Sequence, residues 1–88
     1  MENMHVSIIV PTFNEAEALP ELLERIDRTL QECSGPYEIV IIDDGSTDQT
    51  PGILRRLSTQ YPQMSAIRFR RNYGKAAALS EGFARAQG

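Results

Sequence analysis

The sequence predicts an α/β fold, with elements in the order β-α-β-α-β-α and a parallel sheet in a three-layer arrangement. Three short apolar segments, at 6–10, 37–42 and 65–70, have the composition and length of strands. Each is followed by a segment whose apolar residues recur at helical spacing. Strands that alternate with helices run parallel, and right-handed crossovers place the helices on the faces of the sheet.

The first strand is expected at 6–10, where the nearly continuous apolar run is typical of a strand buried on both faces. Pro11 ends this strand, and a polar loop follows. A helix then begins near Pro20, because a proline in the first turn costs little. The Ser-Gly-Pro sequence at 34–36 ends the helix. Its apolar stripe consists of Leu19, Leu22, Leu23, Ile26, Leu30 and Cys33, the last as a small core residue.

The second strand is expected at 37–42, and the acidic and small residues at 43–48 predict a loop. Asp48 is expected to cap a second helix that has Pro51 in its first turn. The sequence Tyr61-Pro62 ends this helix. Its inward residues are expected to be Ile53, Leu54 and Leu57.

The third strand is expected at 65–70, a turn at 72–74, and a third helix from about 75 to 87. A fourth strand would be expected next, so we interpret 1–88 as the N-terminal part of a single domain. Three parallel strands leave two open edges, through which the chain is expected to self-associate. The inward residues of the third helix are expected to be Ala76, Leu79, Phe83 and Ala86.

Composition excludes several classes of protein. The net charge of −3 argues against a dedicated nucleic-acid binder, although Arg68, Arg70, Arg71 and Lys75 form a local basic patch. The apolar run at 6–10 is too short for a signal peptide, and no stretch approaches the ~20 apolar residues of a membrane span. One cysteine permits no internal disulfide, which fits a cytoplasmic location.

Three polar segments, at 11–15, 43–46 and 71–75, are expected at the carboxyl ends of the strands, where ligands of such sheets bind. They contain an aromatic ring, several carboxylates and a lysine. This mixture suits a nucleotide, since a ring stacks on a base, a carboxylate accepts from base or ribose, and a lysine offsets phosphate charge. The glycine-rich G-x-G-x-x-G and G-x-x-x-x-G-K-[ST] phosphate motifs are lacking, as are metal-ligand clusters and catalytic triads.

Each of these side chains also has a purely structural interpretation. Phe13 can pack under its loop, and Glu15 is favoured beside a helix start by the helix dipole. Asp43 and Asp44 are adjacent and repel each other, so we assign Asp43 to loop amides as an Asx turn and Asp44 to a ligand. Lys75 opposes the dipole at a helix start, a conflict that an anionic ligand removes, but it is otherwise an ordinary surface lysine.

Together the segments resemble family 2 glycosyltransferases. Residues 6–15 resemble the opening strand and loop of that family, 37–48 its second strand and acidic loop, and 71–79 its third signature. The resemblance covers about 6–88. It implies a Rossmann-like GT-A fold that binds a nucleotide-sugar donor, with 1–88 as the nucleotide-binding first half.

The resemblance also implies roles for particular residues. Pro11 and Phe13 would line the base, with the ring stacked on it, and Glu15 would face the ribose or base. Asp44 would accept from the base, with a neighbouring backbone contact from Ile42. The nucleotide-sugar-binding residues implied in this way are Pro11, Phe13, Glu15, Ile42, Asp44 and Lys75, the last of these near the base or the diphosphate.

The third signature is most similar to transferases that act on dolichyl or polyprenyl phosphate. A UDP- or GDP-sugar donor, a lipid-phosphate acceptor and membrane association of the parent at its cytoplasmic face are therefore expected. The divalent metal, Mg²⁺ or Mn²⁺, would be held by an Asp-x-Asp sequence after the fourth strand, beyond Gly88. No catalytic residue is expected within the chain, so the fragment by itself is expected to be inactive.

Two other functions remain open at this point. A phosphorylation-receiver module also has paired acids on such a sheet, but it places them after the first strand, whereas Asp43 and Asp44 follow the second. A non-enzymatic nucleotide-binding or interaction domain is the other alternative. The presence or absence of Asp-x-Asp in the following segment separates that domain from the enzyme.

Overall fold

The computed structural model describes residues 6–32 and 35–86, which form three strands and three helices in strict alternation. The predicted α/β order is therefore confirmed. Cys33 lies outside the described residues, so its predicted core position is not tested. The elements are β1 (Val6–Thr12), α1 (Leu19–Gln31), β2 (Tyr37–Asp43), α2 (Thr50–Gln60), β3 (Met64–Arg68) and α3 (Lys75–Arg85).

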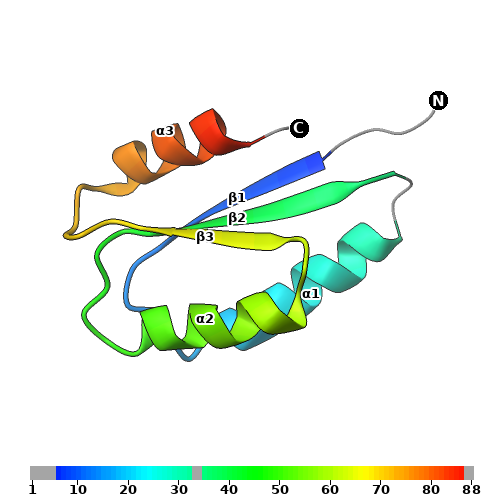
Figure 1. Ribbon diagram of the computed structural model, residues 1–88, viewed down its shortest axis with the longest axis horizontal. Helices are drawn as coiled ribbons and strands as arrows, with labels where there is room; N and C mark the ends of the chain where they lie inside the picture. Colours follow the sequence, from blue (N-terminus) through cyan, green and yellow to red (C-terminus); the bar gives the residue numbers. More distant parts are fainter. Residues whose placement is uncertain (1–5, 33–34, 87–88) are drawn as a thin grey trace.

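The strands form one parallel sheet in the order β1-β2-β3. The pairing of β1 with β2 runs from Val6 opposite Tyr37 to Thr12 opposite Asp43, and Asp43 in turn lies opposite Arg68 of β3. Helices α1 and α2 cover one face of the sheet and α3 covers the other, which gives three layers (Figure 1). All three strands consequently end at the same edge.

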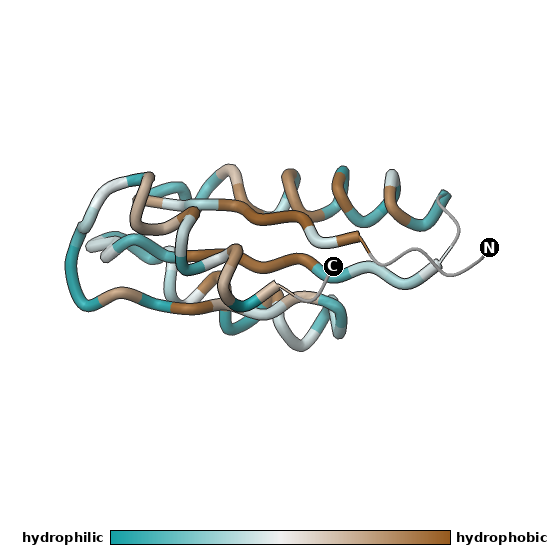
Figure 2. The backbone as a smooth tube through the Cα atoms, turned by 90° about the horizontal axis from the view of Figure 1, so that it is seen from above, coloured by the Kyte–Doolittle hydropathy of each residue, from teal (hydrophilic) through white to brown (hydrophobic). Residues whose placement is uncertain are grey.

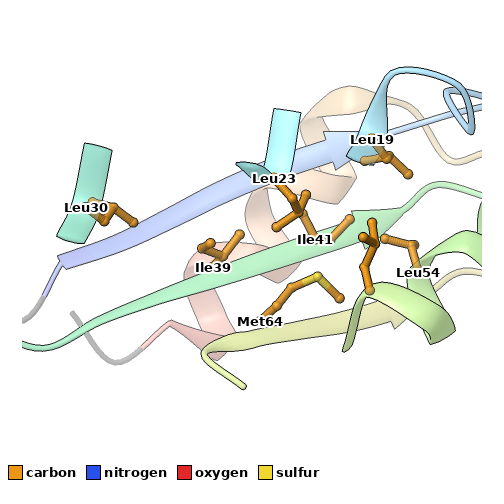
Figure 3. Packing of buried hydrophobic residues seen from close by; sticks show 8 residues of the cluster. Leu19, Leu23, Leu30, Ile39, Ile41, Leu54 and Met64 are labelled. Carbon is orange, nitrogen blue, oxygen red and sulfur yellow. The ribbon is translucent and has the colours of Figure 1, made fainter. Parts of the chain in front are cut away.

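The larger core lies between the sheet and the two helices α1 and α2. Ile39 and Ile41 of β2 are fully buried there, and Leu23 of α1 and Leu54 of α2 pack against them (Figure 3). Full burial of such a side chain contributes about 1.5–3 kcal/mol. Leu22 is the exception to the predicted α1 stripe, because it is 37% exposed and faces away from the sheet.

The second core is smaller and lies under α3, where the predicted inward face was wrong for two of its four residues. Ala78 and Gly82 are the buried residues of this helix, whereas Ala76 is exposed and Phe83 is 67% exposed. A Cβ at Gly82 would lie 2.3 Å from Cγ2 of Ile9, so the helix approaches the sheet too closely for a larger residue. Small residues therefore make the closest contact with the sheet. Leu79 and Ala86, which were also predicted to face inward, are partly buried.

The helix starts follow the sequence prediction, and two strand ends do not. Pro20 and Pro51 both lie in the first turns of their helices, as predicted. Strand β1 continues through Pro11 to Thr12, although Pro11 was predicted to end it, because β1 is an outer strand of this sheet, where a proline is tolerated. Strand β3 ends at Arg68, although the pattern predicted a strand to residue 70. The amide of Phe69 still donates a 2.8 Å hydrogen bond to the carbonyl of Asp43, after which the chain turns away from the sheet.

Candidate functional site

Three loops lie together at the carboxyl edge of the sheet, at the left end of the molecule in Figure 1. The first connection, 13–18, joins β1 to α1; the second, 44–49, joins β2 to α2; and the third, 69–74, joins β3 to α3. Figure 2 shows mainly hydrophilic residues at this end and apolar residues along the strands. Because α3 returns over β1 and β2 on the opposite face from α1 and α2, the direction of winding reverses here. Such a reversal is where doubly wound sheets bind ligands.

An open cavity of about 440 Å³ lies between these connections. Five of the six predicted binding residues line it, and the sixth, Ile42, does not, because its side chain is fully buried between the sheet and α3. The cavity is also lined by Thr12, Asn72 and Gly74, which the sequence analysis did not single out. The one sign in the sequence that they belong to the site is that each lies in or beside a predicted site segment. The predicted residues that line the cavity are Pro11, Phe13, Glu15, Asp44 and Lys75.

Asn14 fastens the first connection to the second. Its Oδ1 accepts hydrogen bonds from the amides of Thr47 (2.8 Å) and Asp48 (3.2 Å), and its own amide donates to Oγ of Ser46 (2.9 Å). Its φ of 53° is in the left-handed region, which asparagine tolerates better than most residues. The neighbouring ring of Phe13 is 42% exposed at the cavity, so it is not packed under the loop.

Asp48 and Thr50 make a second set of links between the same connections. Oδ1 of Asp48 accepts from the amide of Thr50 (2.9 Å), and its Oδ2 accepts from the amide of Ala16 (3.4 Å). The N-cap of α2 is Gln49, which makes no side-chain capping bond, so Asp48 lies one residue before the position that the prediction gave it. Oγ1 of Thr50 accepts from the amide of Glu15 (3.1 Å). The hydroxyl of Thr50, together with the amides, holds the pKa of Asp48 below its ordinary value.

The paired acids have separate structural partners. Asp43 is 1% exposed, and its Oδ1 accepts a 2.9 Å bond from the amide of Ser46, so its predicted bond to a loop amide is confirmed. Asp44 is 4% exposed, and its two oxygens accept from the amides of Tyr73 (2.8 Å) and Gly74 (3.0 Å). Asp44 therefore lines the cavity while it is bonded to the third connection.

The cavity also includes the start of α3. Lys75 is the first residue of this helix and is exposed, and the N-cap residue, Gly74, has no side chain to cap it. The first turn contains no acidic residue. In residues 6–32 and 35–86, no ion pair involves Lys75. The charge of Lys75 and the positive end of the α3 dipole therefore meet at this end of the cavity, next to Asp44, whose carboxylate accepts from the amide of Gly74.

An aromatic and basic surface borders the cavity. The guanidinium of Arg71 lies 5.1 Å from the centre of the Tyr73 ring, and Phe69 meets the same ring edge-on at 5.5 Å. Arg68 and Arg70 are exposed beside them. Of the predicted basic patch, Lys75 lines the cavity, whereas Arg68 lines a separate hollow beside α2. None of the described residues form a group of three metal-ligand side chains that could hold an ion.

The fold and the cavity define a doubly wound α/β domain with a candidate ligand site at its chain reversal. The family model described as Glycosyl transferase family 2 matches residues 7–88, and the chain belongs to that family. Within the described residues, every helix is too short or too polar to span a membrane.

Similar proteins agree with this assignment. The chain is 40% identical over 84 residues to an undecaprenyl-phosphate 4-deoxy-4-formamido-L-arabinose transferase of Pseudomonas syringae, across 94% of this chain and 25% of the relative. It is 45% identical over 85 residues to a dolichol-phosphate mannosyltransferase of Pyrococcus furiosus, across 97% of this chain and 23% of that protein. The chain thus spans about a quarter of the length of these relatives.

Solved structures show the same fold. A mannosyltransferase of Pyrobaculum calidifontis, solved in complex with GDP-Man and Mn²⁺, superposes with a TM-score of 0.82 at 34% identity, over 99% of this chain and 26% of that one. The TarS protein of S. aureus superposes with a TM-score of 0.76 at 29% identity, over 97% of this chain and 25% of that one. The predicted fold class is therefore confirmed.

Proposed function

We propose that this chain is the nucleotide-sugar-binding part of a glycosyltransferase, which moves a sugar from a nucleoside diphosphate to an acceptor. One observation carries the proposal: the cavity at the chain reversal is lined by five of the six residues that the family resemblance assigns to the donor. In this proposal residues 1–88 are the N-terminal part of a single GT-A domain. Family membership and the fold of the solved transferases support it.

The base is assigned to the side of the cavity that carries Phe13 and Pro11. A partly exposed ring on a hydrogen-bonded loop offers a fixed platform, and base stacking on such a ring contributes about 1–3 kcal/mol. Glu15 lines the same side and supplies acceptors for ribose hydroxyls or base N–H groups. Ile42 contributes through its backbone, because its side chain belongs to the core.

We assign Lys75 and the first turn of α3 to the diphosphate of the donor. A helix N-terminus attracts phosphate through its free amides and dipole, and a lysine adds a full charge. The transferred sugar and the acceptor would lie beyond the described residues. The isolated chain is therefore proposed to bind donor without transferring sugar.

The donor and acceptor of the whole protein are proposed by analogy with its relatives. A solved neighbour holds GDP-Man, and two relatives are named for polyprenyl-phosphate acceptors. We infer a GDP- or UDP-sugar donor and a lipid-phosphate acceptor, used at the cytoplasmic face of a membrane. A divalent metal would neutralise the leaving diphosphate, and from the family resemblance we propose that its ligands lie in a segment after Gly88.

The test removes the stacking ring from the full-length protein. Phe13→Ala is expected to weaken the binding of UDP or GDP by roughly 5- to 150-fold, the range that corresponds to loss of one stacked aromatic, as measured by calorimetry. Leu22→Ala removes a comparable partly exposed apolar side chain from the outer side of α1 and is expected to change nothing. Equal affinities for the Phe13→Ala and unsubstituted proteins would argue against this site.

A transfer assay separates the enzyme from a non-enzymatic nucleotide-binding domain. The full-length protein with donor, metal and a polyprenyl phosphate is expected to release nucleoside diphosphate and form the glycolipid. Binding of UDP or GDP without any transfer, over a panel of sugars and acceptors, would favour the binding domain instead.

A further inference from the structure

Two buried side-chain atoms at the carboxyl end of the sheet have no hydrogen-bond partner among the described residues. They are Oγ1 of Thr12 and Oδ2 of Asp43. Thr12 is 2% exposed and Asp43 is 1% exposed, so solvent does not reach either side chain freely. Leaving a buried polar atom unpaired costs free energy, and the cost is larger for a carboxylate, so native proteins pair nearly all such atoms.

The two residues are neighbours in the sheet. Thr12 ends β1, Asp43 ends β2, and they lie opposite each other in the register. Val10 and Ile41, two residues earlier in each strand, pack into the core under α1 and α2. Alternation along the strands turns the side chains of Thr12 and Asp43 to that same face, and adjacent strands are only about 4.8 Å apart. A hydroxyl that can donate therefore lies beside a carboxylate oxygen that can accept.

The other neighbour of Asp43 in the sheet is Arg68 of β3. Its side chain is exposed, and within 6–32 and 35–86 no ion pair joins it to Asp43. Oδ2 of Asp43 is shielded from solvent, so the guanidinium would have to enter the interior to reach it. The hydroxyl of Thr12 is already in the interior and brings no charge with it, which favours Thr12 as the donor.

A bond between these two residues would complete a ring of contacts around the backbone that carries Phe13. On one side of Phe13, the amide of Asn14 donates a 2.9 Å hydrogen bond to Oγ of Ser46. The amide of Ser46 in turn donates one of 2.9 Å to Oδ1 of Asp43. On the other side, Thr12 directly precedes Phe13. Both residues that flank the aromatic ring would then be tied to the same carboxylate.

We propose that the hydroxyl of Thr12 donates a hydrogen bond to Oδ2 of Asp43, and that Thr12 is in this way a positioning residue for the ring of Phe13. It acts through Asp43 and the second connection, because its own oxygen is buried and is not offered to the nucleotide. The inference rests on the proposed nucleotide site, in which this ring stacks on the base. It adds to that site a residue that supports the ring without touching the ligand.

The experiment measures the binding of UDP and GDP to full-length variants by calorimetry. Thr12→Val keeps the branched shape but lacks the hydroxyl, and it is expected to weaken binding of both nucleotides about tenfold, because a loosened ring stacks less well. Thr12→Ser keeps the hydroxyl and is expected to bind within about twofold of the unsubstituted protein. Thr59→Val makes the same chemical change on the exposed side of α2, where the hydroxyl donates to the carbonyl of Arg56, and is expected to change nothing.

A double-mutant cycle tests whether the two residues act as a pair. Thr12→Val is expected to weaken UDP binding in the unsubstituted protein but to have little further effect when Asp43→Ala is already present. Losses that multiply, as for independent sites, would overturn the pairing. Arg68→Gln is expected to leave UDP binding unchanged, and a loss that appears with Arg68→Gln and not with Thr12→Val would assign Oδ2 of Asp43 to the arginine instead.

Hydrogen exchange provides a second measurement that needs no nucleotide and no folded Asp43→Ala variant. The amide of Ser46 is bonded to the same carboxylate, so its exchange is expected to be faster in Thr12→Val than in Thr12→Ser or the unsubstituted protein. Equal exchange in all three would overturn the proposed bond. Faster exchange with unchanged UDP and GDP binding would confirm the bond and overturn the positioning role, with the proposed function left intact.

Failure of the proposed function has a different signature. If the unsubstituted full-length protein binds neither UDP nor GDP, the nucleotide site is wrong, and the role of Thr12 toward a stacking ring is overturned with it. The exchange of the Ser46 amide in Thr12→Val then still decides whether the bond itself exists.

Discussion

The interior of the sheet and its carboxyl edge are held together by different interactions. In the interior, apolar side chains such as Ile41 and Leu23 pack with no exposed surface. At the edge, polar side chains bond to backbone amides of segments 29 to 35 positions away in the sequence, as Asp44 does to Tyr73 and Gly74. The interior therefore sets the stability of the fold, and the edge sets the geometry of the cavity.

The largest effect on stability is expected from a substitution in the interior of the sheet. Ile41→Ala removes most of a fully buried side chain in the central strand and is expected to lower the free energy of unfolding by about 2–5 kcal/mol. Urea denaturation of the full-length protein measures this. The folded fraction is expected to keep its nucleotide affinity, because the residue does not line the cavity. A small stability loss with a large affinity loss would contradict the separation of interior and edge.

A matched pair of glycines tests the close contact of α3 with the sheet. Gly82→Ala is expected to destabilise by about 1–3 kcal/mol, because its Cβ would overlap Cγ2 of Ile9. Gly52→Ala, in α2, meets nothing within 4 Å and is expected to stabilise by about 0.5–1 kcal/mol through helix propensity. Thermal unfolding of both variants checks the prediction, and stabilisation by Gly82→Ala would show that the helix can move outward.

A smaller effect is expected from loosening the edge alone. Asn14→Gly keeps a residue that accepts the positive φ but removes the acceptor for the amides of Thr47 and Asp48. The expected cost is about 0.5–1.5 kcal/mol, with faster hydrogen exchange at these two amides. Unchanged exchange at both amides would mean that the loop does not depend on Asn14.

The smallest effect concerns pH. The pKa of Asp48 is lowered from 3.8, first by the hydroxyl of Thr50 and also by amide bonds. Because the folded-state pKa is lowered, the stabilisation is present above the ordinary value and is lost as the pH falls through the folded-state pKa. Carboxyl NMR titration measures the midpoint, and Thr50→Val is expected to raise it. If the midpoint of Asp48 is the same in Thr50→Val, the hydroxyl is not the cause of the lowered pKa.

The sequence predicted most of the fold because the core follows apolar runs and helical spacing. It failed in part for α3, where helical spacing selected Ala76 and Phe83, which are exposed. The close contact with Ile9 is made instead at Gly82. The sequence also placed the end of β3 two residues late, since the apolar alternation continues to Phe69, one residue beyond Arg68, the last residue of the strand. Close approach and chain direction are not visible in a hydropathy pattern.

The site was predictable to the level of segments. Residues that follow parallel strands share one edge, so the approach of Phe13, Glu15 and Lys75 to one cavity could be expected. Of the separate hydrogen-bond partners of Asp43 and Asp44, the sequence predicted only those of Asp43. The bond of Asp43 to a nearby loop amide is local, whereas the bonds of Asp44 to Tyr73 and Gly74 depend on how a distant segment folds back.

The most direct test of the central claim is an amide NMR titration of the full-length protein with UDP and GDP. The account predicts shifts that centre on the three connections, at Phe13, Glu15 and Lys75, with little change at the opposite end of the sheet near Tyr37. Saturable shifts elsewhere, or none at millimolar nucleotide, would contradict the assignment of this cavity to the donor.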